Sequence, residues 1–316
     1  MESKKVLFSI VCPTFNRSKL LRRAIDSALR QQLEDFELII VNDGSTDDTR
    51  DLVSSCNDER IIYIEHEKNM GLNAARNTGF NRAKGKYIVT LDDDDELSKF
   101  ALQMAFNIYN RLSDGRIKVL FFNCINVESR LISGKSIPGE TIIRYEDLLC
   151  EKLRGDYWVV VERSILPEGS IFEENLWGSA GILWSRLLRN FDGYYVPKIA
   201  YFAYRKHELP RLTNYEANSK NLQIHENRIK MFLREFGADT KLYCPKVYSK
   251  QIATLAFYQL LNKNFRQARL NLILSLKNNF SVYVLGLLAL TFIGNEKSAL
   301  FVYERLFRTY FARIFF

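Results

Sequence analysis

The sequence predicts an α/β fold in which a mostly parallel sheet is flanked by helices and followed by an all-helical C-terminal extension. Residues 1–125 alternate short apolar runs with amphipathic segments, a pattern typical of buried parallel strands joined by crossover helices. From about residue 216 the apolar residues recur with helical spacing instead. A hydrophobic content of 47% and a charged content of 26% are those of a globular chain and exclude a disordered one.

The first 125 residues predict five strands with a helix between each pair. The strand segments are, in order, VLFSIVC, FELIIVN, RIIYIEH, KYIVTLD and IKVLFFNCI. The helical segments between them are SKLLRRAIDSALRQQ, STDDTRDLVSSC, MGLNAARNTGFNRAKG and SKFALQMAFNIYNRL. Ligands of such sheets bind at the carboxyl ends of the strands, so we expect the chemistry after the first, second and fourth strands.

The rest of the chain is predicted to change character twice. Residues 126–214 are less regular and rich in aromatic residues, and five helical segments follow, with breaks expected at 237–239, 262–264 and 294–295. The longest apolar stretch, 280–294, has fifteen residues, fewer than the ~20 that a transmembrane helix needs. No transmembrane helix is therefore predicted.

The basic charge lies in the C-terminal quarter of the chain. Residues 241–316 contain eleven Lys and Arg against two Glu, a net charge of +9, so the remaining residues carry −1 of the total of +8. One interpretation is a solvated basic helical unit that packs on the core; the other is contact with an anionic membrane surface. No recognition motif supports nucleic acid as a partner.

Five widely spaced cysteines without a CxxC pair favour neither a disulfide framework nor a zinc site, and they fit a reducing cytoplasm. The start, MESKKVLFSIVC, places basic residues before an apolar run. That run is short and lacks a small-residue cleavage site, so we interpret it as a first strand and not as a signal peptide.

Two strand-end loops carry candidate binding residues. Pro13 is expected to stop the ladder after the first strand, leaving Thr14 and Phe15 at the sheet edge. After the second strand Gly44 permits a tight turn, and Asp43 offers a hydrogen-bond acceptor. Taken alone, NDGSTD is equally well explained as an ordinary strand-to-helix turn.

The fourth strand ends in a run of four aspartates, Asp92, Asp93, Asp94 and Asp95. Adjacent like charges repel and lose water near a strand end, so the run is expected to need a compensating cation. Alternate residues of an extended chain face the same side, and hard carboxylate oxygens suit Mg²⁺ or Mn²⁺. The alternative is a solvated acidic loop that caps the helix after it.

Three ordered segments resemble the motifs of family-2 glycosyltransferases, which are inverting enzymes of the GT-A fold. They are FSIVCPTFNRSKLLRRAIDSALRQQLEDFELIIVNDGSTDDT, NMGLNAARNTGFNRAKGKYIVTLDDDDEL and LPEGSIFEENLWGSAGILWSRLL. The resemblance implies a Rossmann-like GT-A domain over 1–215, with a nucleotide-binding half (1–125) and an acceptor half (126–215), followed by a basic helical extension (216–316).

The resemblance also implies roles for individual residues. The donor and nucleotide site would comprise Pro13, Thr14, Phe15, Asp43, Asn73, Arg76, Asp92, Asp93, Arg205 and His207. Asp43 would accept a hydrogen bond from the base, normally uracil. The metal, Mn²⁺ or Mg²⁺, would be held by Asp94 with Asp92 and Asp95. Asp93 stands where the family often has a small residue.

The catalytic base implied by the resemblance is Glu174. The family commonly carries a Glu-Asp pair whose Asp takes the acceptor proton, and here Glu173 is followed by Glu174. Glu174 keeps a carboxylate on a side chain that is one methylene longer. The alternative is that both glutamates lie on a surface helix.

Together these features predict a metal-dependent inverting hexosyl- or N-acetylhexosaminyltransferase. It would move a sugar from a nucleotide-sugar donor to a hydroxyl of a glycan or lipid-linked glycan in cell-surface polysaccharide assembly. The expected donor is a UDP-sugar. The expected location is the cytoplasm, with peripheral contact to an anionic membrane through 241–316 left open. The alternatives are a nucleotide-sugar-binding protein with lost or weak catalysis and a nucleotidyltransferase, although PTFNRSK lacks the Gly-rich triphosphate loop of the latter.

Overall fold

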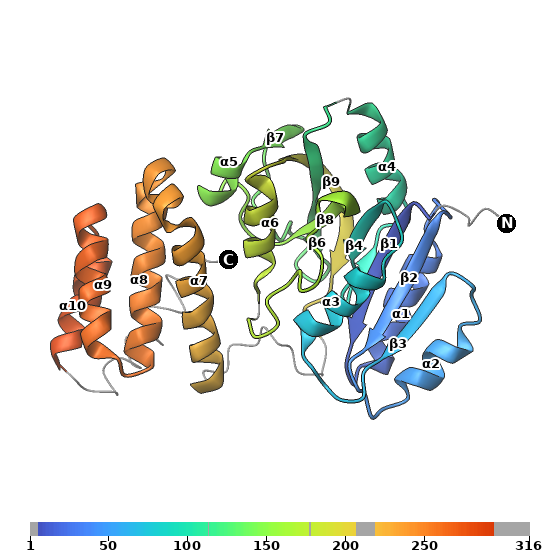
Figure 1. Ribbon diagram of the computed structural model, residues 1–316, viewed down its shortest axis with the longest axis horizontal. Coiled ribbons are helices and arrows are strands. Elements are labelled where there is room, and N and C mark those ends of the chain that lie inside the picture. The colour runs from blue at the N-terminus through green and yellow to red at the C-terminus, as the bar shows by residue number, and fades with distance from the viewer. Residues whose placement is uncertain (1–5, 113, 177, 207–218, 294–316) are drawn as a thin grey trace. The chain divides into compact units, whose positions relative to one another are not determined.

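The computed structural model describes residues 6–112, 114–176, 178–206 and 219–293. Its strands are β1 Phe8–Thr14, β2 Phe36–Asn42, β3 Ile61–Glu65, β4 Tyr87–Thr90, β5 Glu96–Leu97, β6 Ile117–Asn126, β7 Thr141–Ile143, β8 Tyr157–Glu162 and β9 Asp192–Ala203. Its α-helices are α1 Ser18–Leu29, α2 Thr49–Ser55, α3 Leu72–Arg82, α4 Ala101–Arg111, α5 Tyr145–Leu149, α6 Ala180–Leu188, α7 Ser219–Tyr243, α8 Pro245–Leu261, α9 Phe265–Asn278 and α10 Val282–Ile293 (Figure 1).

The chain divides into two compact units. The first comprises Met1–Tyr145, Asp156–Asn175 and Ser179–Arg211, and the second comprises Glu146–Gly155, Leu176–Gly178 and Leu212–Phe316. The expected domain boundary at 215/216 lies outside the described residues. The two expected halves, 1–125 and 126–215, both contribute strands to the sheet of the first unit.

The first unit is built on a sheet with the strand order β3-β2-β1-β4-β8-β6-β9-β5, and β7 pairs with β9. The strands β3, β2, β1 and β4 are all parallel. The prediction of a mostly parallel sheet is confirmed, since β6 and β9 also pair parallel to each other. The exceptions are β5 and β7, which pair antiparallel with β9, and β8, which inserts antiparallel to both β4 and β6. The segment before β8 has no regular hydrophobic period, so the sequence did not indicate a strand of opposite direction there.

Helices cover both faces of the parallel half. Buried residues of α1 and α4 share one core with Phe8, Ile10 and Cys12 of β1. On the other face α3 lies so close to the sheet that a Cβ at Gly79 would stand 2.3 Å from a methyl carbon of Val11. The first-strand residues alternate between these two faces, as the strand period requires.

Pro13 ends only one of the two ladders of β1, which corrects the expectation from sequence. Pairing with β4 stops at Val11, whereas pairing with β2 continues through Pro13 to Thr14. Proline lacks an N–H but keeps its carbonyl, so one neighbouring strand can still continue alongside it.

The second unit contains the helices α7, α8, α9 and α10, whose buried residues form a separate core. The predicted helix break at 237–239 is wrong, since α7 runs to Tyr243. Glycine in a helix interior costs only about 1 kcal/mol, and packing of the helix can offset that cost. The expected break at 262–264 is confirmed between α8 and α9, and the fifth expected helical segment lies outside the described residues.

Cys150 and Cys244 form a disulfide within the second unit, which corrects the expectation that no cysteines pair. The two residues are 94 positions apart, a separation with no sequence signature. Cys12, Cys56 and Cys124 are free. Among the described residues, no helix has both the length and the hydropathy needed to cross a membrane.

Candidate active site

The candidate site lies where the carboxyl ends of the parallel strands meet. Thr14 ends β1, Asp43 follows β2, and the four aspartates follow β4. Parallel strands place these ends at one edge of the sheet. The loops that the sequence predicted to carry the site therefore lie at one edge of the sheet.

The four aspartates divide into a cluster of three and one separate residue. Asp92, Asp94 and Asp95 can each offer a carboxylate oxygen such that the three oxygens lie within 4.8 Å of one another. Asp93 is held elsewhere: it accepts hydrogen bonds from the Thr14 hydroxyl at 2.8 Å and from Arg17 Nη1 at 3.0 Å. The carboxylate of Asp93 thus braces the loop against β1 and the start of α1.

Arginines supply part of the compensating charge that the run needs. Arg17 Nη1 also lies 3.1 Å from Asp94 Oδ2, and Arg76 Nη2 donates to Asp92 Oδ1 at 2.9 Å. A metal ion is therefore not the only cation available to the run. The side chain of Asp92 is 45% exposed, so the cluster is open to solvent on that side.

Burial raises the pKa of two aspartates of the run. Desolvation raises the pKa of Asp93 to about 6, against the opposing attraction of Arg17. Desolvation, followed by repulsion from Asp92 and Asp94, raises the pKa of Asp95 to about 7. The carboxylate of Asp95 accepts a hydrogen bond from the backbone N–H of Tyr204 at 2.8 Å.

A second arginine from α1 ties the acidic loop to the residue after β9. The guanidinium of Arg23 donates to the Asp94 carbonyl and lies 3.7 Å from the centre of the Tyr204 ring. The Tyr204 hydroxyl in turn donates to Glu96 at 2.9 Å. Sequence reasoning missed Arg23 and Tyr204, and Tyr204 follows β9, a strand that was not predicted from the sequence.

Asp43 is buried, and hydrogen-bonding groups surround its carboxylate. Its carboxylate accepts from the backbone N–H groups of Met70 and Gly71 and is bonded to His66 Nδ1 at 2.7 Å. His66 Nε2 lies 2.9 Å from the Thr78 hydroxyl. His66, which directly follows β3, is a residue that sequence reasoning missed.

Helix α3 presents two buried asparagines to the segment that carries the glutamate pair. Asn73 donates to the Glu173 carbonyl at 2.7 Å, and Asn77 donates to Glu174 Oε1 at 3.1 Å. The Glu173 carboxylate is paired with Arg186 at 2.8 Å. Asn77 was missed from sequence, although its i, i+4 spacing from Asn73 places both on one helix face.

The remaining expected residues are more dispersed. Arg205 donates from its guanidinium to Asp156 at 2.8 Å and from its backbone N–H to Glu128. Phe15 is 40% exposed, and Arg76, whose side chain is 15% exposed, has no hydrogen-bond partner for its Nε within the described part of the chain. His207 lies outside the described residues.

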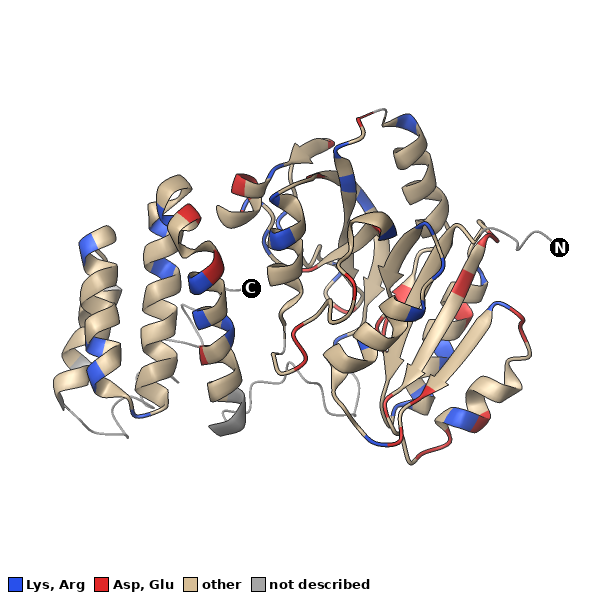
Figure 2. Cartoon of the chain, in the orientation of Figure 1, with Lys and Arg blue, Asp and Glu red and all other residues tan. Residues whose placement is uncertain are grey.

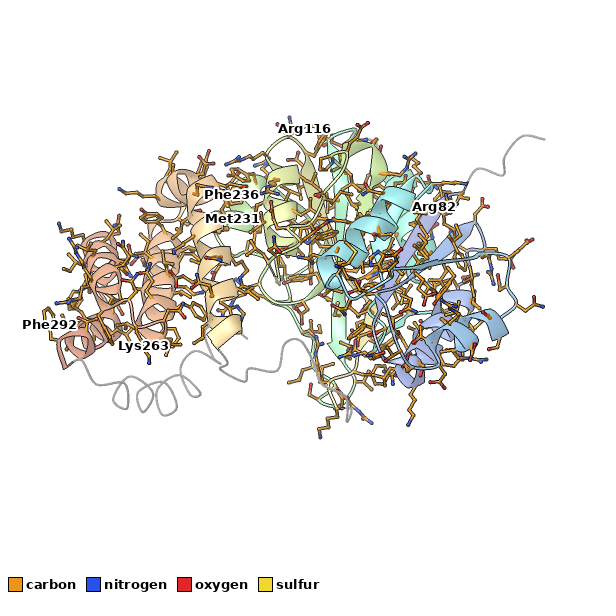
Figure 3. All side chains as sticks on the ribbon, turned by 60° about the horizontal axis from the view of Figure 1, so that its bottom comes forward. Arg82, Arg116, Met231, Phe236, Lys263 and Phe292 are labelled. Carbon is orange, nitrogen blue, oxygen red and sulfur yellow. A yellow bond between two sulfur atoms is a disulfide. The ribbon has the colours of Figure 1, made fainter. Side chains whose placement is uncertain are left out.

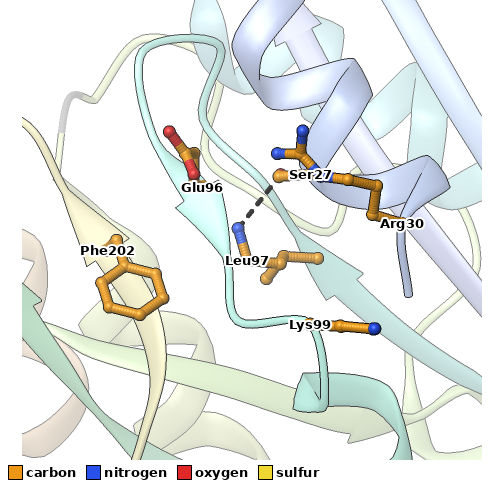
Figure 4. A pocket seen from close by; sticks show the side chains of 6 residues that line it. All are labelled: Ser27, Arg30, Glu96, Leu97, Lys99 and Phe202. Atoms are coloured by element: carbon orange, nitrogen blue, oxygen red, sulfur yellow. Dashed lines mark hydrogen bonds between the residues drawn. The ribbon is translucent and has the colours of Figure 1, made fainter. Parts of the chain in front are cut away.

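A pocket of about 400 Å³ adjoins the acidic loop from the side of α1 and β5 (Figure 4). Its lining residues are Ser27, Arg30, Glu96, Leu97, Lys99 and Phe202. Inside it the Leu97 N–H donates to the Ser27 hydroxyl at 3.1 Å. None of the clustered aspartates is among its lining residues, so the pocket and the acid cluster are separate features.

The donor set of the acid cluster fits a hard divalent cation. Three carboxylate oxygens that can converge are the ligand type that Mg²⁺ and Mn²⁺ prefer. Two of the three residues are buried and the third is partly open, an arrangement that leaves room for water or phosphate oxygens on a bound ion.

The chain is similar in sequence to known proteins. The model of the family described as "Glycosyl transferase family 2" matches residues 9–127. The GalNAc(5)-diNAcBac-PP-undecaprenol beta-1,3-glucosyltransferase of Campylobacter jejuni is 31% identical over 306 residues, which cover 91% of this chain and 94% of that protein.

Two solved structures share the fold. S. aureus TarS 1-349 in complex with UDP-GlcNAc superposes with a TM-score of 0.64 at 17% identity, covering 95% of this chain and 92% of that one. The mannosyltransferase PcManGT from Pyrobaculum calidifontis, in complex with GDP-Man and Mn²⁺, gives a TM-score of 0.55 at 16% identity over 96% of this chain and 82% of that one.

Proposed function

This chain belongs to glycosyltransferase family 2 and is a glycosyltransferase, and on that premise we propose that it is metal-dependent and inverting. The proposed donor is a UDP-sugar, and the proposed acceptor is a hydroxyl of a lipid-linked glycan. The observation that carries the metal and donor site is the convergence of Asp92, Asp94 and Asp95 at the end of β4.

We assign the metal, Mn²⁺ or Mg²⁺, to these three carboxylates. When bound, such an ion supplies Lewis-acid stabilisation of the departing diphosphate. The chain's own residues provide the rest of the donor site. Arg76 lies beside the cluster as a cation for phosphate oxygens, and the Asp43 carboxylate is held in place for the base by its backbone donors.

We assign the proton transfer to the Glu174 carboxylate. Glu174 accepts the acceptor hydroxyl proton while that oxygen forms a bond to the anomeric carbon of the donor. The bond from the anomeric carbon to the diphosphate oxygen breaks in the same step, so a single displacement inverts the anomeric centre. Asn77 orients this carboxylate through its bond to Oε1.

The donor and acceptor classes rest on similarity. TarS is solved with UDP-GlcNAc, and the Campylobacter relative is named for a polyprenyl-linked acceptor and matches over nearly its whole length. We extend the proposal to an enzyme whose segment 241–316 contacts an anionic membrane, where such an acceptor would reside.

Calorimetric titration with UDP, with and without Mn²⁺, tests the donor site. We expect Mn²⁺ to strengthen UDP binding and Asp94→Asn to weaken that metal-dependent binding by at least about tenfold. Asp51→Asn on α2, an exposed aspartate away from the strand ends, is the matched control and should bind as the wild type does. A UDP affinity that changes neither with Mn²⁺ nor with Asp94→Asn would refute the assignment of the metal.

A further inference from the structure

The helices α8, α9 and α10 carry an unusual charge distribution. Residues 244–293 contain six Lys and Arg and no Asp or Glu. Figure 2 shows basic residues on α8 and α9 and no charged residue on α10. Lys250 is paired with Glu151, but no acid within α8, α9 or α10 offsets the remaining positive charge, so these helices attract an anionic partner.

Helix α9 has a solvent-exposed apolar stripe opposite its buried face. The stripe consists of Arg266, Leu270, Ile273, Leu274 and Lys277, all of them exposed. Their spacing of i, i+4, i+7, i+8 and i+11 places them on one side of the helix. Three apolar residues, with Leu270 55% exposed, therefore stand between two cations.

Helix α10 has an exposed stripe that contains no polar side chain. Val282, Leu285, Ala289 and Phe292 are exposed at intervals of three or four residues. Val282 is 75% and Phe292 69% exposed, and Phe292 lies at the outer edge of the helices (Figure 3). The same helix buries Val284 and Leu287 in the core of its unit, so burial within the fold does not explain the stripe.

The α10 stripe contacts a residue of α9 that is next in sequence to Leu270 of the α9 stripe. The guanidinium of Arg269, on α9, lies 5.1 Å from the centre of the Phe292 ring on α10. The two stripes together thus combine exposed aliphatic and aromatic side chains with cations at their margin. This combination is the one by which helices lie in the interface of an anionic bilayer.

We propose that the exposed stripes of α9 and α10 are the surface that docks on anionic phospholipid. A second copy of this chain fits less well, because a symmetric contact would oppose the cations of one stripe with the same cations of the other. An anionic bilayer offers both the opposite charge and an apolar layer. The proposal deepens the membrane contact proposed above and specifies its residues.

Cosedimentation of the full-length protein with lipid vesicles tests this proposal. We expect binding to vesicles of equal parts phosphatidylcholine and phosphatidylglycerol, weak binding to pure phosphatidylcholine, and loss of binding as salt is raised. The triple variant Leu270→Gln, Ile273→Gln, Leu274→Gln should lower the vesicle partition coefficient more than about tenfold. The double variant Arg266→Gln, Lys277→Gln should lower it roughly tenfold or more.

A matched control replaces three exposed apolar residues of the first unit, Leu131, Ile142 and Ile199, with Gln. This control should bind the anionic vesicles as the wild type does, and light scattering without lipid should give the same mass for all variants. Equal partitioning of the triple variant and the wild type would overturn the proposal. So would a wild-type dimer that the triple variant turns into a monomer, since a second copy would then cover the stripes.

The vesicle assay contains neither donor nor acceptor, so it is independent of catalysis. UDP titration of the same preparations separates the two proposals. Intact UDP binding with no vesicle binding would overturn only the docking surface. Vesicle binding without UDP binding would overturn only the donor assignment.

Discussion

At the scale of single residues, Glu173 and Glu174 are adjacent carboxylates with different surroundings. Glu173 is half-buried and paired with Arg186, whereas Glu174 is exposed and accepts a hydrogen bond from Asn77. We expect Glu174→Gln to lower kcat by about 10²- to 10⁴-fold and to leave UDP affinity unchanged, because the amide cannot take a proton. Glu173→Gln should retain most of the activity. Sugar-transfer assays on both variants show which glutamate acts as the base. A Glu174→Gln enzyme with unchanged kcat would exclude Glu174 as the base.

The residues of the site could be predicted from sequence in part. The four aspartates and Asp43 lie at strand ends, as the alternation of strands and helices indicates. The side chains to which these aspartates bond could not be predicted from strand ends. That Asp93 bonds to Thr14 and Arg17 depends on side-chain directions, which the spacing of an acid run does not determine. His66 follows β3, a predicted strand, so the strand-end rule indicates it. Tyr204 follows β9, which lies in the irregular segment 126–214 and has no periodic signal in the sequence.

At the scale of elements, the contact of α3 with the sheet depends on the absence of a side chain at Gly79. An added Cβ would lie 2.3 Å from a methyl carbon of Val11 and 3.3 Å from one of Val41. We expect Gly79→Ala to lower the free energy of unfolding by about 1–3 kcal/mol through overpacking, and to disturb Asn73 and Asn77 on the same helix. Urea denaturation measures the change.

Gly237→Ala is the control for that experiment. Gly237 also lies inside a helix, but there the nearest atoms to an added Cβ stand 3.7 Å away, at ordinary contact distance. Alanine is the better helix former, so this substitution should raise the free energy of unfolding by up to about 1 kcal/mol. Similar losses in both variants would show that the approach to Val11 does not account for the cost at Gly79.

Elements with a strong period were predictable, and those whose position depends on tertiary contacts were not. The parallel strands and their helices follow from apolar runs and amphipathic spacing. The insertion of β8 between β4 and β6 depends on a long irregular connection. The continuation of α7 past Gly237 depends on packing, which outweighs the local preference of glycine.

At the scale of the whole molecule, the disulfide closes a large loop of the chain. Cross-linking residues 94 positions apart removes denatured-state entropy worth about 4–5 kcal/mol in the chain-entropy model. We expect Cys150→Ser to destabilise the second unit by up to about that amount, and a reducing agent to do the same to the wild type. Cys56→Ser, which removes a free cysteine, is the control. Equal urea midpoints for the oxidised and the reduced wild type would contradict this role.

The pH dependence of the second unit is expected to involve His225. Burial, with a smaller contribution from Arg228, lowers the pKa of His225 from 6.5 to about 4, and its ring stacks on Tyr258 at 5.2 Å. Between these pH values the unfolded chain binds a proton that the folded chain does not, so stability should fall as the pH drops from 6.5 toward 4. His225→Phe keeps a ring against Tyr258 and should show a smaller loss. Urea midpoints at pH 7 and pH 5 compare the two, and an identical loss would assign the pH dependence to other groups.

The path of the chain between the units has a consequence for fragmentation. The chain leaves the first unit at Tyr145 and contributes Glu146–Gly155 and then Leu176–Gly178 to the second unit. It returns to the first unit after each of these segments and enters the second unit again after Arg211. Because Cys150 is bonded to Cys244, residues 150–244 form a closed covalent ring. A protease that cuts once within this ring, for example between 207 and 218, yields pieces that migrate together on a gel until thiol is added. A single cut in this ring therefore separates the two fragments only after the disulfide has been reduced.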